Sequence, residues 1–261
     1  MENHAHLKSC ARKIHLGSAA NDAIAMTFPH VNTTDGPVAL PMEHKTKEHR
    51  FEPYDFNGGT VLAVAGKDFV VVAGDTRLST GYSILSRDES KIHEVAPNVL
   101  LASPGSFNDV VQLRGVLGIR SQMYQHDNEQ PPTIEAMAQL LMNTLYQRRF
   151  FPYYSFCLLC GITKDGKGAV YEYDAVGSHK NTSRGAQGSG GHLMMPLLDN
   201  LVTHESRSDP LVDLTIDQTK SIIKDAFITA GERDIYTGDK VEIFVITSQG
   251  TTKEVFLLKQ D

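Results

Sequence analysis

The chain has 261 residues, a length typical of one domain or two small ones, and its 41% hydrophobic and 21% charged residues are ordinary for a globular protein. Its 25 basic and 31 acidic side chains give a formal charge of −6, and the excess acid lies after residue 49. This distribution excludes phosphate-driven binding of nucleic acid. No apolar run is long enough to span a membrane and no secretory signal is recognised, so we expect no membrane partner and a location in cytoplasm and nucleus.

Residues 1–49 differ in character from residues 50–261. They hold six of the eleven histidines, three prolines and no sustained helical or strand period, which predicts a flexible leader ahead of one folded domain. The histidines are scattered rather than spaced as metal ligands, so we expect solvated side chains and neither a metal nor a cofactor.

The folded domain alternates strands and helices in pairs. We expect a hairpin at 61–66 and 69–75, further strands at 84–85, 92–95 and 99–103, a helix at 108–124 and a second helix starting after Thr133. Strands at 155–162 and 169–173, a helix after Gly190, a helix at 216–232 capped by Thr215, and strands at 241–247 and 253–258 follow. Hairpin connections make the sheets antiparallel, and the order predicts an α+β fold, a four-layer αββα sandwich.

Several short segments together are similar to one known family. The run Asn57-Gly58-Gly59-Thr60, then Asp75-Thr76-Arg77, Lys91, Ser103-Pro104-Gly105, and later Gly188-Ser189-Gly190 and 232–238 resemble the β-type subunits of the 20S proteasome over nearly all of 50–261. The resemblance implies the sandwich of the N-terminal-nucleophile hydrolases, which agrees with the predicted layers. It also implies partners, the other α and β subunits in heptameric rings, with polypeptide as the substrate of the assembly.

Within that family, residues 50–54, 57–60 and 148–154 resemble the sixth β position, which is non-catalytic in eukaryotes. Active relatives carry an N-terminal threonine whose freed amine serves as base. The spacing from Asp75 and Lys91 places Gly59 at the nucleophile's position, where no side chain exists. We therefore expect no catalytic residue. Instead, Asp75, Arg77 and Lys91 should form a buried ion-pair network, with Gly105, Ser189, Asp234 and Thr237 as remnants of the family's site.

An active threonine protease using Thr60 is the main alternative, and an unrelated binding module of the same fold is another. Thr60 lies one residue after Gly59 on a strand, so its hydroxyl is expected to point away from the site. Cys157 and Cys160 are three apart on a strand and should face opposite sides, as core thiols rather than a metal or redox pair.

Two further assignments follow from the resemblance. The leader is expected to be removed between His49 and Arg50 by an active neighbour. The segment Asp174, Ala175 and Val176 is expected to help line the cleft of the neighbouring chymotrypsin-like subunit, where the Asp174 carboxylate can accept a hydrogen bond from a bound peptide. The alternative for Asp174 is an ordinary acidic turn residue before Gly177.

Overall fold

Two five-stranded antiparallel sheets form the centre of the molecule. The structure is a computed structural model that describes residues 51–204, 206–208, 210 and 213–260, so the predicted leader lies outside the described residues. The first sheet has the spatial order β10 (Arg184–Gly188), β1 (Thr60–Ala65), β2 (Phe69–Asp75), β11 (Lys240–Thr247) and β12 (Gly250–Leu257). The second has the order β5 (Ile92–Ala96), β6 (Val99–Ala102), β7 (Leu158–Ile162), β8 (Gly168–Tyr173) and β9 (His179–Thr182).

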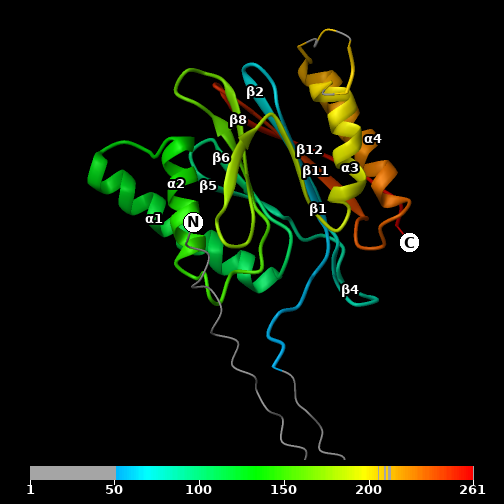
Figure 1. The fold of residues 1–261 in the computed structure, drawn as a ribbon, viewed down its shortest axis with the longest axis horizontal. Coiled ribbons are helices and arrows are strands. Elements are labelled where there is room, and N and C mark those ends of the chain that lie inside the picture. The colour runs from blue at the N-terminus through cyan, green and yellow to red at the C-terminus, as the bar shows by residue number, and fades with distance from the viewer. Residues whose placement is uncertain (1–50, 205, 209, 211–212, 261) are drawn as a thin grey trace, which may run out of the picture. The chain divides into compact units, whose positions relative to one another are not determined.

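A small hairpin and four helices complete the described part of the chain. The hairpin is β3 (Leu78–Thr80) with β4 (Ser83–Ser86), and the helices are α1 (Phe107–Asn128), α2 (Ile134–Tyr146), α3 (Gly191–Leu198) and α4 (Ile216–Gly231). A π-helical turn, Asp199–Thr203, continues directly from α3. Helices α1 and α2 lie on one side of the sheets and α3 and α4 on the other (Figure 1).

Strand alternation creates three apolar layers. On β1, Val61 and Ala63 face the second sheet, whereas Leu62 and Val64 pack with residues of α3 and α4. On β6, Leu100 points between the sheets and Leu101 packs under α1 and α2. Because side chains alternate across a strand, each sheet buries both faces, and the predicted four-layer αββα sandwich is confirmed.

The start of α4 is set by local hydrogen bonds that the sequence predicts. The Thr215 hydroxyl accepts the Gln218 N–H at 3.3 Å, and the Gln218 side chain accepts the Thr215 N–H at 2.9 Å, a reciprocal capping box. The predicted N-cap is therefore confirmed. Helix α1 begins at Phe107, one residue before the predicted start, and extends four residues beyond the predicted end at Tyr124, to Asn128.

Three short strands were not predicted, and one predicted strand begins later than expected. β3, β9 and β10 are short and largely polar or glycine-containing, so no apolar alternation marks them. The predicted strand 155–162 is wrong at its start: pairing in β7 begins at Leu158, while Ser155 forms an isolated bridge with Gly105. The final strand begins earlier than predicted and covers Gly250–Leu257 rather than 253–258, because the pairing of β11 with β12 extends to Thr247 and Gly250.

Cys157, just before β7, and Cys160, within it, are both buried and free. Cys157 packs with the α1 and α2 side and Cys160 with the layer between the sheets, so the prediction of opposite faces is confirmed. Burial raises the pKa of the Cys157 thiol to about 11 and that of Cys160 further still. In the part of the chain that the structure describes, no helix has the length and apolarity to cross a membrane.

Candidate functional site

Gly59 lies immediately before β1, in a backbone conformation with φ of +82°. A Cβ atom built at this position would stand 1.9 Å from Cε and 2.7 Å from Nζ of Lys91. The lysine side chain thus occupies the space that a residue 59 side chain would need. The carbonyl of Gly59 accepts the Ser189 N–H at 3.1 Å, which ties it to the end of β10.

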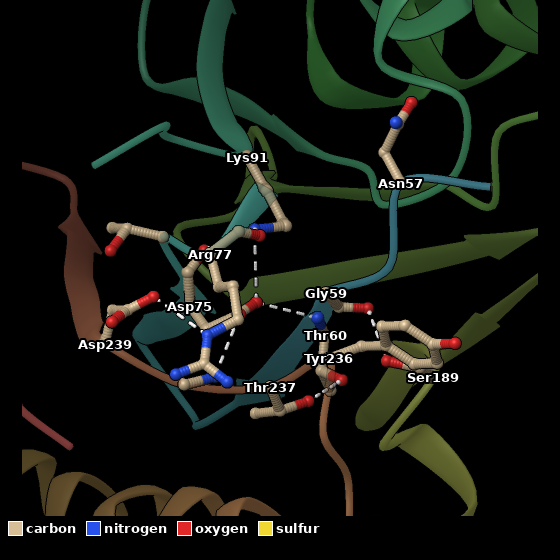
Figure 2. A network of polar contacts seen from close by, with 12 residues as sticks. Asn57, Gly59, Thr60, Asp75, Arg77, Lys91, Ser189, Tyr236, Thr237 and Asp239 are labelled. Carbon is tan, nitrogen blue, oxygen red and sulfur yellow. Dashed lines mark hydrogen bonds and ion pairs between the residues drawn. The ribbon is translucent and has the colours of Figure 1, made fainter. Parts of the chain in front are cut away.

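Lys91 and Asp75 form a buried ion pair beside Gly59 (Figure 2). The Nζ atom of Lys91 lies 3.3 Å from Oδ1 of Asp75, and it also donates to the carbonyls of Asp75 and Arg77 at 2.9 and 2.7 Å. Burial raises the pKa of the Asp75 carboxyl, and the Lys91 ammonium and the N–H groups of Thr60 and Gly238 oppose that rise. This half of the predicted network is present.

Arg77 forms an ion pair with Asp239, a partner that the sequence analysis did not name. Its Nε donates to Oδ2 of Asp239 at 2.9 Å and its Nη1 to the carbonyl of Ile235 at 2.9 Å. Arg87 also contacts the other carboxylate oxygen of Asp239. The carbonyl oxygen of Arg77 accepts from Lys91, while its guanidinium points toward the loop before β11.

The hydroxyl of Thr60 is fully occupied and fully buried. It accepts the Gly190 N–H at 2.8 Å and lies 2.7 Å from Oγ1 of Thr237. Thr237 in turn donates its hydroxyl proton to Oδ2 of Asp234 at 2.6 Å, so the Thr60 hydroxyl must be the donor toward Thr237. Figure 2 shows this side chain pointing toward Thr237 rather than toward Lys91, as strand alternation predicted.

Ser189 and Asp234 complete this second polar group. The Ser189 hydroxyl donates to Oδ2 of Asp234 at 2.6 Å. Asp234 therefore receives two hydroxyl protons on one oxygen, while its other oxygen accepts the Tyr236 N–H at 3.2 Å. The structure thus brings Ser189, Asp234 and Thr237 together, and places them against Thr60 rather than beside an open nucleophile position.

Gly105 lies in a turn that has no room for a side chain. Its φ is +129°, and a Cβ there would meet the carbonyl oxygen of Tyr154 at 2.3 Å. Its carbonyl accepts the Asn57 N–H at 3.1 Å. A close backbone approach therefore explains why this position is a glycine.

Asp174 lies in the turn between β8 and β9, with its side chain exposed. Its Oδ1 accepts the N–H groups of Val176 at 3.0 Å and Ser178 at 2.8 Å. One carboxylate oxygen therefore fixes the turn. Ala175 and Val176 are half-buried within the same turn.

Sequence reasoning missed three groups that the structure places at this site. Asp239 neutralises Arg77, Gly190 donates to Thr60, and Asn57 bridges β3 and α1 through its side-chain amide. The only signal for Asn57 was its position before two glycines of positive φ, Gly58 and Gly59. Within the described residues, no group of three or more histidine, cysteine, aspartate or glutamate side chains is placed to hold a metal ion.

A four-layer αββα sandwich with a buried aspartate–lysine pair beside the start of its first strand is typical of the N-terminal-nucleophile hydrolase class. The proteasome subunit family model matches residues 55–246, and the chain belongs to that family. It is 49% identical over 222 residues to proteasome subunit beta type-1 of Arabidopsis thaliana, covering 83% of this chain and 100% of the relative.

Two more distant relatives agree. Proteasome subunit beta type-1 of Danio rerio is 43% identical over 215 residues, covering 82% of this chain and 91% of its own. Proteasome subunit beta type-6 of Saccharomyces cerevisiae is 38% identical over 225 residues, covering 82% and 93%. The sequence resemblance to β-type proteasome subunits is thereby confirmed.

Proposed function

We propose that this chain is a non-catalytic β subunit of the 20S proteasome core. The observation that carries the proposal is the space at Gly59, where the hydrocarbon stem of Lys91 lies in place of a nucleophilic side chain. Asp75 and Lys91 satisfy each other and the surrounding backbone, so the site's charges stabilise the fold without a reaction. The family membership of the chain and its beta type-1 relatives support the same assignment.

Thr60 does not offer a second route to catalysis. An N-terminal threonine needs a free amine and a free hydroxyl. The nitrogen of Thr60 is an amide that donates to Asp75 at 2.8 Å, and its hydroxyl is held by Gly190 and Thr237. To act as nucleophile it would have to break both hydroxyl contacts in a fully buried position.

Covalent labelling of intact particles tests the proposal. Particles purified through a tag on this chain would be treated with a threonine-directed covalent inhibitor, and every subunit weighed by intact mass. We expect adducts on active neighbours, which serve as the internal control, and none on this chain. An adduct on this chain, or a chain beginning at Thr60, would refute the non-catalytic assignment.

In the assembled core, the chain's role is to complete the inner rings. Its partners are the other α and β subunits in heptameric rings, its two sheets form part of the wall of the proteolytic chamber, and the polypeptide substrate passes it without being cut by it. Cytoplasm and nucleus are the proposed locations. Fluorescence imaging of the tagged chain, together with its size on native gels, checks both statements: signal confined to another compartment, or a lone small species, would contradict them.

We further propose that an active neighbour removes the leader between His49 and Arg50. The described part of the chain supports retention of the residues that follow, because Tyr54 is anchored through a hydroxyl bond of 2.7 Å to the carbonyl of Pro152. N-terminal sequencing of the subunit from native particles should give Arg50 first. A first residue at Gly59 or Thr60 would overturn this cut site.

The turn at Asp174 is proposed to contact the cleft of the neighbouring chymotrypsin-like subunit. Asp174→Asn removes the charge while its amide oxygen can still accept from Val176 and Ser178, so the turn is preserved. Loss of one hydrogen bond to a charged group costs about 1.5–3 kcal/mol, about 10- to 100-fold in kcat/KM for peptides with a polar group at that subsite. Asp165→Asn, in the exposed turn after β7, is the control.

Kinetics on assembled particles with site-selective fluorogenic peptides decide the question. The expected result is a change confined to the chymotrypsin-like activity of the Asp174→Asn particles. Unchanged specificity, or equal losses at all three activities, would show that the carboxylate serves only its own turn.

A further inference from the structure

The end of α2 and the turn after it present large aromatic side chains to solvent. In this aromatic turn, residues 146–151, Phe150 is 96% exposed, Tyr146 61% and Phe151 53%. Main-chain hydrogen bonds hold the turn: the Arg149 N–H donates to the carbonyl of Tyr146, and the Phe151 N–H to that of Arg148, both at 3.0 Å. A turn that is fixed in this way and exposes three aromatic rings is typical of a protein contact surface.

Two exposed arginines give the aromatic turn a positive charge. The Arg149 guanidinium lies 5.8 Å from the centre of the Phe150 ring, and that of Arg148 lies 4.5 Å from the centre of the Tyr153 ring. Among the described residues, neither guanidinium forms an ion pair with a carboxylate. The whole chain has a formal charge of −6, so the sign of the turn is opposite to that of the molecule.

The position of Arg149 determines which chemistry a partner needs. A partner that covers the Phe150 ring also removes the Arg149 guanidinium from water, because the two groups lie against each other. An arginine that is buried without a counter-charge destabilises a complex. The partner must therefore offer an apolar pocket for the ring and an aspartate or glutamate at the rim of that pocket.

A row of aromatic contacts leads from the aromatic turn to the hollow beside Asp174. Between ring centroids, Phe151 lies 5.6 Å from Tyr54, and Tyr54 lies 5.4 Å from Tyr154. Tyr154 in turn meets Phe156 edge-on at 5.4 Å. All four rings are at least partly exposed, and Phe156 lines the same hollow as Asp174. The aromatic turn and the Asp174 turn therefore belong to one continuous stretch of surface.

We propose that the aromatic turn docks into an apolar pocket with an acidic rim on the neighbouring chymotrypsin-like subunit, the neighbour already proposed for the Asp174 turn. The inference rests on the proposed function, because the contact exists only in an assembled ring. Phe150 is the anchor of the contact, and Arg149 pairs with the acidic rim. Since the two turns share one surface, docking of the first also positions the Asp174 turn beside the neighbour's cleft.

Photochemical cross-linking in assembled particles tests which partner covers the turn. A phenylalanine that carries a benzophenone group replaces Phe150 in the tagged chain, and mass spectrometry identifies the cross-linked subunit and peptide. We expect an adduct on the chymotrypsin-like neighbour, in a peptide that contains an aspartate or glutamate. The same probe at Tyr82, which is 98% exposed in the turn between β3 and β4, is the control and should not give this adduct.

Incorporation in competition with the wild-type chain measures how much the contact contributes. Phe150→Ala and Arg149→Glu chains are each co-expressed with the wild-type chain, and the ratio of the two is measured in purified particles. We expect each variant to be depleted about tenfold or more, as for residues at the centre of an interface. Lys164→Glu, a charge reversal in the exposed turn after β7, is the matched control and should enter at the wild-type ratio. An arginine in place of the cross-linked acidic residue of the neighbour should restore entry of the Arg149→Glu chain.

The stability of the full chain outside the particle separates docking from a structural role. Because Phe150 is 96% exposed, Phe150→Ala should leave the midpoint of urea denaturation unchanged. Phe227→Ala, which empties a fully buried position on α4, should lower that midpoint and shows that the assay detects a lost core contact.

The inference would be overturned by an adduct only on another subunit, on a second copy of this chain or on a polypeptide in the chamber, by no adduct at all, or by normal incorporation of Phe150→Ala. If the probe at Phe150 prevents incorporation, the same probe at Tyr146, in the same turn, takes its place. Failure of the proposed function is distinct, because this chain would then be absent from the particles or labelled by the inhibitor. An unlabelled chain that enters particles without the adduct would leave the non-catalytic role standing and remove the contact.

Discussion

Gly59→Ala is the substitution that most directly probes the space that Lys91 fills beside Gly59. The new methyl group would enter at φ of +82° and stand 1.9 Å from Cε of Lys91, so the lysine side chain must move. In moving, it weakens the 3.3 Å pair with Asp75 and its two bonds to backbone carbonyls. Gly166 provides a matched control, because its φ is +77° and nothing lies within 4 Å of a Cβ built there.

The two glycines separate backbone strain from the displacement of Lys91. Strain alone at a positive φ costs about 1 kcal/mol, which is the expected effect of Gly166→Ala. Breaking a buried ion pair costs about 3–5 kcal/mol, but Lys91 is flexible and keeps part of its contacts, so we expect about 3 kcal/mol for Gly59→Ala. The difference of about 2 kcal/mol is about a 30-fold change in the folding equilibrium.

Urea denaturation of the full chain followed by far-ultraviolet circular dichroism measures both effects, since the chain has no tryptophan to report by fluorescence. Equal destabilisation by the two substitutions, within about 0.5 kcal/mol, would refute the argument that Lys91 fills this space. A second substitution, Gly59→Thr, tests whether a hydroxyl at this position makes the chain reactive. It adds a hydroxyl but leaves the peptide bond to Gly58 uncut, so such particles should show no inhibitor adduct on this chain.

Three other predictions concern stability and reactivity. Burial and the Arg114 guanidinium lower the pKa of His93 from 6.5 to about 4, so the unfolded chain takes up the proton first and stability falls as the pH drops from about 6.5 to about 4. For this half-buried ring we expect a loss of about 1 kcal/mol between about pH 7 and about pH 5, absent in His93→Gln, in urea titrations at both pH values. Thr215→Ala removes the cap of α4 and should cost about 1 kcal/mol in the same assay; no loss would show that the capping box is dispensable. The Cys157 thiol, with its pKa raised to about 11, should stay unlabelled by a thiol reagent at about pH 8 until the chain is denatured, and rapid native labelling would contradict its burial.

Most of the fold was predictable because its strongest signals are local. The hairpin of β1 and β2 follows from short apolar strands around a polar turn, and α4 from a cap and an amphipathic period. β9 and β10 were not predictable, since their conformation depends on pairing with β8 and β1 rather than on their own polar residues. A strand at the edge of a sheet needs little apolar surface, so its sequence carries little evidence of it.

The site was predictable where a residue's partner lay within the same motif. Asp75 and Lys91 were identified by spacing, and the structure pairs them. The partner of Arg77 was missed because Asp239 comes from a loop at the far end of the domain, a contact that only the completed sheet creates. The role of Asn57 was missed for the same reason, because the partners of its side chain lie on β3 and at the start of α1.

The strand order of the first sheet has a consequence for how this chain folds. β1 and β2 form early as a local hairpin, but the neighbours that flank them, β10 and β11, are synthesised only in the second half of the chain. Until then both edges of an almost entirely apolar hairpin remain unpaired. High contact order of this kind slows folding, and unpaired apolar edges favour aggregation. During synthesis, therefore, β1 and β2 have exposed edges although they are buried in the finished fold. Protection by a chaperone matters most at this stage.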